Sequence, residues 1–386
     1  MIYVILLVLI GIAALVACML WIVVRSRNMQ YWIGSYWKSR ARRRSAATMP
    51  STTVYVCMGD HYEPFGGGAS HEKAMSRVSR WVKEYPEIAR RHRDSLGRVP
   101  QHSFFYPIEE YHSDALAPIA ELCKAGFGDV EIHYHHDNDT AEGLEQALRG
   151  FAETLHERHG LLRRDASGQV EYCFIHGNWA LDNSRPDGRW CGVDNELSVL
   201  VRTGCRVDYS MPSAPDNTQT RKINSIYFAR GQEGKCKSHN DGRDLKVGMW
   251  GEPDELLLVQ GPLGLNWRSR KFGIIPRIEN GEISADAKPT RDRIRLWLKL
   301  APRIEGASEH VFVKLHTHGA TDAATPALLG GDLERMWSYL ESEVRDRPGR
   351  TLRYVTAWEM YQIIKDLAHS KQPATYGASP QEKAAA

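Results

Sequence analysis

From about residue 53 to residue 368, the chain alternates short apolar runs with longer amphipathic stretches. Runs of four to six β-branched and aromatic residues predict strands, and apolar residues spaced three and four apart predict helices. We expect strands at 53–58, 103–106, 129–134, 171–175, 206–209, 256–260, 311–315 and 352–355. We expect helices at 70–94, 113–125, 140–159, 193–203, 291–300, 331–345 and 356–368. This alternation implies parallel strands with right-handed crossovers, and it predicts an α/β fold, a (β/α) barrel of seven or eight units, complete or incomplete.

Two segments depart from the alternation. Residues 212–255 are rich in Pro, Gly, Asn and Asp, so we expect them to form long loops over the functional end of the barrel. Residues 371–386 are predicted to be a disordered tail. The pattern therefore predicts one barrel domain at 53–370.

The amino-terminal segment predicts a membrane anchor. Residues 1–24 contain no charged side chain and are long enough to cross a hydrocarbon core as a helix. A cleaved signal peptide would carry basic residues before its apolar stretch, whereas all seven Lys and Arg residues of 1–50 follow it. We therefore expect an uncleaved transmembrane helix in the lipid bilayer and a basic juxtamembrane linker at 25–52. The positive-inside rule then predicts a single-pass protein of the cell (inner) membrane with its barrel in the cytoplasm.

Charge and cysteine content narrow the possible partners. The net charge of +3 comes from the first 50 residues, because residues 51–386 carry 43 basic and 47 acidic side chains, a net charge of −4. That body lacks the basic surface that nucleic acid requires, so nucleic-acid binding is excluded. The seven cysteines include no CxxC pair and are expected to be reduced, mostly small apolar residues. Nothing in the sequence identifies a protein partner.

Histidines follow four of the predicted strands. The strand ends read Asp60-His61, His133-Tyr134-His135-His136, His176-Gly177-Asn178-Trp179 and His316-Thr317-His318. Barrels of alternating strands and helices build active sites from residues at the carboxyl ends of several strands. The four strand ends therefore predict one shared site that binds a divalent metal through nitrogen and oxygen, with zinc as the default.

The segment 133–139 carries the densest group of candidate ligands, namely His133, His135, His136 and Asp139. In a strand, the side chains at 133 and 135 point to one face and the side chain at 136 points to the other. Which of the three histidines binds metal is left open, and Asp139 has the alternative of capping the next helix. At the first strand end, one member of the Asp60-His61 pair would bind metal and the other would take a proton from water.

The other strand ends suggest an acid and a substrate surface. His316 and His318 face the same side, so either is a candidate general acid, and a histidine held in the core is the alternative for one of them. His176, Asn178 and Trp179 offer polar and aromatic groups to a substrate, with core packing as the alternative for Trp179. The sequence contains no GxSxG, P-loop, GxGxxG or HExxH motif, which argues against covalent serine chemistry and nucleotide binding.

These motifs carry a resemblance to a known family. Residues from about 53 to 368 resemble the glycoside hydrolase/deacetylase barrel superfamily, and specifically polysaccharide deacetylases of carbohydrate esterase family 4. The family's Asp-Asp pair corresponds to Asp60-His61, which implies Asp60 as base and His61 as metal ligand. Its His-x3-His motif corresponds to His135 and Asp139, and its late Leu-His motif implies a catalytic acid at His316 or His318. The family's Arg-Pro substrate motif is replaced here by the segment 176–179.

The sequence thus predicts a membrane-anchored, metal-dependent hydrolase. The resemblance implies cleavage of an amide or ester bond, namely deacetylation of an N- or O-acetylated polysaccharide or sugar intermediate. The predicted metal ligands are His61, His135 and Asp139, with zinc as the expected cofactor. Two alternatives stay open: a catalytically inactive barrel that binds glycan in an assembly, and a glycosidase or cyclic-amide hydrolase of the same superfamily.

Overall fold

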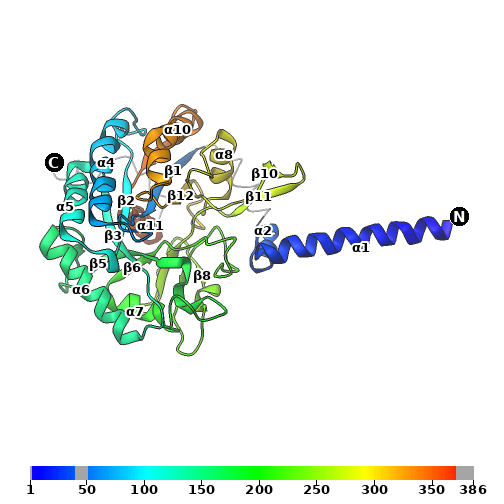
Figure 1. Cartoon of the computed structure of the whole chain (residues 1–386), viewed down its shortest axis with the longest axis horizontal. Coiled ribbons are helices and arrows are strands. Elements are labelled where there is room, and N and C mark those ends of the chain that lie inside the picture. Colours follow the sequence, from blue (N-terminus) through cyan, green and yellow to red (C-terminus); the bar gives the residue numbers. More distant parts are fainter. Residues whose placement is uncertain (1, 40–50, 371–386) are drawn as a thin grey trace.

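A computed structural model describes residues 2–39 and 51–370 of the chain. Figure 1 shows an α/β body from which one long amino-terminal helix projects. The predicted tail at 371–386 and the basic run Arg42-Arg43-Arg44 lie outside the described residues.

The body is built on a sheet of 11 strands, most of them parallel to their neighbours. Its path runs in the order β12-β1-β2-β3-β5-β6-β9-β7-β8, and β13 and β4 pair at its side with β1 and β5. The bounds are β1 Thr52–His61, β2 His102–Pro107, β3 Gly128–Tyr134, β4 Arg163–Arg164, β5 Val170–His176, β6 Cys205–Asp208, β7 Ile226–Ala229, β8 Arg243–Asp244, β9 Leu256–Val259, β12 His310–Thr317 and β13 Arg350–Tyr354. Each of the eight predicted strands is present.

Alternate residues of these strands belong to two separate cores. In β1, Tyr55 and Cys57 pack in an inner core that also contains side chains from β6, β9 and β12. Val54 and Val56 pack in an outer core between the sheet and the surrounding helices. Because strands from both ends of the sheet path share the inner core, the sheet is strongly curved.

The predicted (β/α) barrel, complete or incomplete, is not confirmed. Within residues 51–370, the hydrogen-bonded path ends at β12 on one side and at β8 on the other. The chain after β9 still lies against β12. Gly261 is so close to β12 that a Cβ atom added at this residue would be only 2.7 Å from the carbonyl oxygen of Lys314. The structure therefore shows a mixed α/β fold with a curved, parallel-rich sheet.

Helices cover the outside of the curved sheet (Figure 1). They are α4 His71–Ala89, α5 Ser113–Leu122, α6 Ala141–His159, α7 Glu196–Thr203, α8 Arg291–Leu300, α9 Ala324–Ala327 and α10 Leu333–Leu340. Helix α11 (Ala357–His369) is different, because Met360 and Ile364 pack in the inner core. The amide of Ala357 donates to Ser103 Oγ, near the start of β2, so α11 covers the amino-terminal end of the strands and leaves the carboxyl ends for a site.

Shorter helical turns connect these elements. They are η1 Met29–Tyr31, η2 Ile108–Glu110, η3 Cys123–Phe127, η4 Gly177–Trp179, η5 Leu181–Asn183, η6 Ser238–Asn240, η7 Leu328–Asp332 and η8 Glu341–Arg345. The segment expected to consist of loops, 212–255, contains the antiparallel strands β7 and β8. A separate two-stranded sheet follows, formed by β10 (Gly264–Lys271) and β11 (Ile275–Glu279).

Helix α1 (Ile2–Ser26) has no buried residue and is long and apolar enough to cross a membrane. A signal sequence has the same character, and the orientation of the chain stays a prediction. The next residues differ from a solvated linker, because η1 and α2 (Ile33–Lys38) pack against the body. Trp32 and Tyr36 are buried with Leu263 and Leu300, in a third hydrophobic cluster.

Candidate active site

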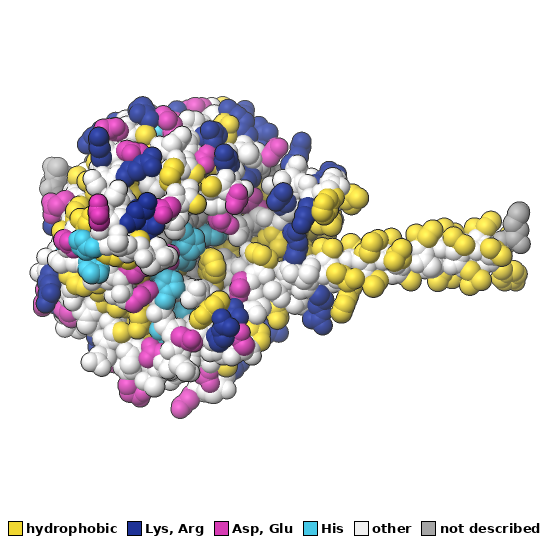
Figure 2. Space-filling view, in the orientation of Figure 1, with side chains coloured by type: hydrophobic (Ala, Val, Ile, Leu, Met, Phe, Trp, Pro, Cys, Tyr) yellow, Lys and Arg dark blue, Asp and Glu magenta, His cyan; other side chains and the backbone are white. Residues whose placement is uncertain are grey.

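The carboxyl ends of β1, β3 and β12 bring five polar side chains together. Since β1 is parallel to β12, with Gly59 opposite His316, the two strands end at the same edge of the sheet. We call the group His61, Glu63, His133, His135 and His318 the strand-end site. Figure 2 shows histidine side chains near the middle of the visible face of the body and, separately, toward its left side.

Strand parity explains the membership of this site. The inner side of β1 carries Tyr55 and Cys57, so His61 also points inward. The same rule puts His133 and His135 on the inner side of β3, and it puts His316 and His318 on the inner side of β12. Asp60, His136 and His176 have the opposite parity, and the structure places them away from the strand-end site.

Glu63 lies at the centre of the site. Its Oε1 atom is 3.2 Å from Nε2 of His133 and 3.4 Å from Nε2 of His135. Its Oε2 atom is 3.6 Å from Nδ1 of His318. Burial alone would raise the pKa of Glu63, but hydrogen bonds with these three histidines outweigh burial and hold the pKa well below its usual range. Glu63 is therefore an anionic centre surrounded by imidazoles.

His133 is oriented so that one nitrogen faces Glu63. Its Nδ1 atom lies 2.8 Å from the carbonyl oxygen of Ile175, which can only accept, so Nδ1 carries a proton. Nε2 then either donates a second proton to Glu63 or offers a lone pair to a cation. A backbone hydrogen bond on the far nitrogen is the arrangement that orients histidine ligands in metal sites.

His61 completes a set that fits a metal ion. Its ring centroid is 4.7 Å from that of His133 and 4.5 Å from that of His318. Burial, reinforced by these neighbouring imidazoles, lowers the pKa of His61 well below its ordinary value, which favours a neutral ring with a free lone pair. One ligand atom from each of His61, Glu63 and His133 lies within 4.8 Å of the others. Two nitrogens and one carboxylate oxygen are suitable ligands for zinc.

His135 is held between two carboxylates. Its Nδ1 atom pairs with Oε1 of Glu109, and its amide donates to Oε2 of Glu109 at 3.3 Å. Burial would lower the pKa of His135, but the hydrogen bonds to Glu109 and Glu63 outweigh burial and raise the pKa to about 10. Glu109 follows β2 by two residues, as Glu63 follows β1. A search for carboxylates just past predicted strands would have found Glu109 as well as Glu63.

A cleft of about 480 Å³ opens beside the site, and its wall contains His316, His318, Trp179 and Glu282. The Trp179 ring is 5.9 Å from the His61 ring and 5.8 Å from the His318 ring, centroid to centroid. Burial, together with the charge of Lys314, lowers the pKa of His316 well below its ordinary value. Nδ1 of His316 has no hydrogen-bond partner in the described part of the chain. The cleft therefore joins an aromatic surface to a basic, nitrogen-rich wall.

Asp60 faces the helices rather than this cleft. Its Oδ1 atom accepts from the amide of Gly319 at 2.5 Å, and its Oδ2 atom lies 2.8 Å from Nε2 of His102. Trp81 Nε1 donates to the carbonyl oxygen of the same glycine at 3.0 Å. Both carboxylate oxygens are thus engaged, and Asp60 fixes the residue that follows His318.

The other sequence-predicted residues separate into different places. Asp139 lies 3.2 Å from Nδ1 of His136, in a second cluster that also includes His176. Asn178 and Trp179 are in η4, where both residues have a positive φ. Of the predicted ligands, the structure brings His61 and His135 to the strand-end site and leaves Asp139 outside it. The catalytic and binding roles of all these residues stay predictions.

The sequence matches no protein-family profile and no curated protein. Among solved structures, the chain is similar to an alpha-mannosidase from Enterococcus faecalis V583, with a TM-score of 0.41 and 8% identity over 84% of this chain and 30% of that chain. It is similar to TK1436, a GH57 branching enzyme from Thermococcus kodakaraensis, with a TM-score of 0.40 and 9% identity over 86% and 72%. It is also similar to a GH57-type branching enzyme from Pyrococcus horikoshii, with a TM-score of 0.39 and 10% identity over 85% and 73%. The chain thus spans about 30% of the length of the mannosidase, and none of these three proteins is a polysaccharide deacetylase.

Proposed function

We propose that the protein is a metal-dependent hydrolase that removes an acetyl group from an N- or O-acetylated carbohydrate. The observation that carries this proposal is the convergence of His61, Glu63 and His133 on one small volume at the edge of a cleft. In this assignment these three side chains hold a divalent cation, with zinc favoured by the nitrogen and oxygen donors. The cation would supply Lewis acidity to the scissile carbonyl. Glu63 and His133 therefore take the ligand positions for which Asp139 and His135 were predicted.

The remaining residues of the site then have their own tasks. His318 lies on the cleft wall with Nδ1 facing Glu63, and hydrogen bonding to Glu63 overcomes burial to raise its pKa. We assign it the task of donating a proton from Nε2 to the leaving group. The Glu109 carboxylate fixes the ring of His135 beside the ligands. Trp179 offers a flat apolar face on which a sugar ring could rest.

Asp60 receives a positioning role in this proposal instead of the predicted role of base. It holds the Gly319 amide and thereby sets the position of His318. Loss of the Asp60 charge would lower activity by displacing Gly319 and His318, and it would not remove a metal ligand.

Metal removal tests the proposal in the full-length protein. Treatment with a chelator should abolish acetate release from acetylated oligosaccharides, and added zinc should restore it. His133→Ala should lose one equivalent of bound metal and reduce acetate release by about a hundredfold or more, because the Lewis acid is lost. His369→Ala, at an exposed histidine of α11, is the matched control and should keep both.

A second candidate function is a glycosidase, and one observation favours it. The charges of Glu63 and Glu282 both oppose the effect of burial on the pKa of His318, and Glu282 lies in the cleft wall, so two carboxylates lie near one imidazole of the cleft. A pair of carboxylates across a cleft is what glycoside hydrolysis requires. If this candidate is correct, Glu282→Gln abolishes release of reducing sugar, chelation has no effect, and no acetate appears. That result would overturn the deacetylase assignment.

A further inference from the structure

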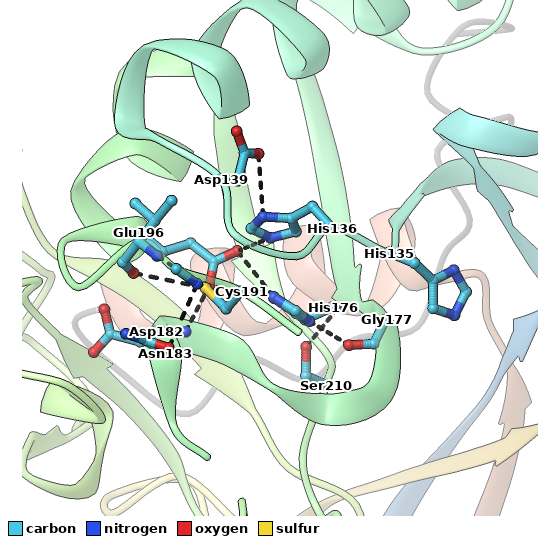
Figure 3. Close-up of polar contacts among 12 residues, drawn as sticks. His135, His136, Asp139, His176, Gly177, Asp182, Asn183, Cys191, Glu196 and Ser210 are labelled. Atoms are coloured by element: carbon cyan, nitrogen blue, oxygen red, sulfur yellow. Dashed lines mark hydrogen bonds and ion pairs between the residues drawn. The ribbon is translucent and has the colours of Figure 1, made fainter. Parts of the chain in front are cut away.

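A second group of ligand-type side chains lies where β3 and β5 end, next to the strand-end site. We call it the His–Cys–Glu cluster, and it consists of His136, His176, Cys191 and Glu196. His136 follows β3, His176 ends β5, Cys191 lies in the connecting loop, and Glu196 begins α7. All four residues are more than nine-tenths buried. Figure 3 shows their side chains pointing toward one another.

Glu196 connects the cluster. Its Oε1 atom is 3.2 Å from Nε2 of His136 and 3.4 Å from Nε2 of His176. Its Oε2 atom is 3.4 Å from Sγ of Cys191 and also accepts the amide of Asp182 at 2.5 Å. One ligand atom from each of the four side chains lies within 4.8 Å of the others. Two imidazole nitrogens, one sulfur and one carboxylate oxygen thus surround a single point.

The hydrogen bonds around His176 leave an unsatisfied lone pair in the middle of the cluster. Nδ1 of His176 pairs with the carbonyl oxygen of Gly177, which can only accept, so Nδ1 carries a proton. In the neutral ring, Nε2 then presents a lone pair toward the carboxylate of Glu196. That Nε2 atom has no hydrogen-bond partner among the residues that the structure describes. A fully buried lone pair that faces an anion is unfavourable unless a cation lies between the two.

The residues around the cluster also favour a bound cation. On the far side of His136, Nδ1 lies 3.2 Å from Oδ2 of Asp139, and a carboxylate at that position orients the ring of a histidine ligand. The amide of Val193 points at Sγ of Cys191, at 3.4 Å. A bound metal ion would take the place of the thiol proton of Cys191, because cysteine binds metal as the thiolate.

We propose that the His–Cys–Glu cluster binds a zinc ion in a structural site. Four protein ligands of types N, N, S and O match the closed tetrahedral coordination of structural zinc, and burial leaves no position for a substrate. The ion would join the ends of β3 and β5 to the start of α7, and it would fix the intervening loop. That loop contains five non-glycine residues with positive φ, namely Asn178, Trp179, Asp182, Asn183 and Trp190, so it needs a strong local constraint.

This site is separate from the strand-end site, although the two are adjacent. His135 and His136 are consecutive residues whose side chains diverge, so one strand end supplies both sites (Figure 3). The loop fixed by the zinc ion also carries Trp179 to the cleft. The inference does not rest on the proposed deacetylase activity, since a structural ion is required by the cluster itself.

Cobalt substitution tests the inference in the full-length protein. Protein loaded with Co²⁺ should show a sulfur-to-cobalt charge-transfer band, because the cluster contains a cysteine and the strand-end site does not. Cys191→Ser should lose this band and one equivalent of bound metal. Cys236→Ser is the matched control, an exposed thiol on a neighbouring loop, and should keep both.

A second measurement covers the case in which Cys191→Ser does not fold. In the wild-type protein, alkylation of individual cysteines can be followed by mass spectrometry before and after treatment with a chelator. Cys191 should be protected with zinc present and should react after zinc removal, while the core thiol of Cys173 stays protected in both conditions. Absence of the charge-transfer band from the wild-type protein, or protection of Cys191 that does not depend on metal, would overturn the inference.

Discussion

Single buried carboxylates organise the histidines of this protein. Glu63 collects His133, His135 and His318, and Glu196 collects His136 and His176. In each group, imidazole nitrogens from more than one strand end face a single carboxylate. Asp60 works differently, because one of its oxygens accepts from a backbone amide and the other pairs with another histidine, His102.

The role of Asp60 can be tested by kinetics. Asp60→Asn keeps the shape but weakens the hold on Gly319 and His102, so kcat should fall about tenfold, the equivalent of roughly 1.4 kcal/mol. Bound metal should be unchanged, and both limbs of the pH profile of kcat/KM should persist. His102→Gln should cause a similar loss that does not add to the first, because the two residues act through one contact. Disappearance of the acidic limb in Asp60→Asn would instead identify Asp60 as the base.

At the scale of elements, two of the parallel strands carry a buried charged side chain. Asp208 in β6 and Lys314 in β12 are both buried and interact electrostatically. Burial raises the pKa of Asp208 to about 7, against the opposing effects of Ser210 and Lys314. The pKa of an aspartate in an unfolded chain is about 3.9. At pH values between these two pKa values, Asp208 therefore takes up a proton when the chain folds. The stability that this protonated form contributes is lost as the pH rises through about 7.

This linkage predicts a pH-dependent effect of Asp208→Asn on stability. The asparagine side chain does not ionise, so its burial does not depend on pH. Between pH 5 and pH 8, the free energy of unfolding of the wild-type protein should therefore fall by up to about 3 kcal/mol relative to that of the variant. Urea unfolding of both proteins at the two pH values measures the difference. An equal difference in unfolding free energy at pH 5 and pH 8 would mean that Asp208 is ionised in the folded protein throughout.

The elements of the fold could be predicted well from the sequence, and their long-range associations could not. The eight predicted strands are present because each is an apolar run bounded by turn residues. Strand β7 has only four residues inside a loop-rich segment, which gave no periodic signal. Trp32 and Tyr36 belong to the segment predicted as a basic juxtamembrane linker, whereas the structure buries them against Leu263 and Leu300.

The candidate site was likewise predictable in its local motifs but not in its long-range contacts. The strand-end histidines could be predicted to form a site because the carboxyl ends of parallel strands lie at one edge of a sheet. Their division into two groups depended on side-chain parity at the very end of each strand. Cys191 and Glu196 lie in a loop and at a helix start, far in sequence from His136 and His176, so no local pattern connected them.

At the scale of the whole molecule, the residues after α1 form part of the body. Trp32 is fully buried in the third hydrophobic cluster, and Lys237 lies over the ring of Tyr31, with its Nζ 4.7 Å from the centroid. The segment 28–39 therefore contributes to the fold, although it precedes the first strand of the sheet.

Two soluble fragments test this contribution. A fragment of residues 51–370 would expose Leu263 and Leu300, and the loss of packing around a buried tryptophan is worth on the order of 3–5 kcal/mol. It should melt at a lower temperature than a fragment of residues 28–370, which keeps η1 and α2. Trp32→Ala in the longer fragment should reproduce most of the loss. Equal melting temperatures for the two fragments would show that the segment adds nothing to stability.

Asn28 lies in the wall of the cleft, and its amide donates to the carbonyl oxygen of Pro215 at 3.0 Å. Only one residue separates it from the end of α1 at Ser26. If α1 crosses a bilayer, no flexible linker separates the cleft from the membrane-spanning helix. The cleft then lies at a fixed, short distance from the lipid surface. Under the proposed function, its reach would then be limited to sugars presented close to that surface, and a glycan far from the membrane would have to approach it.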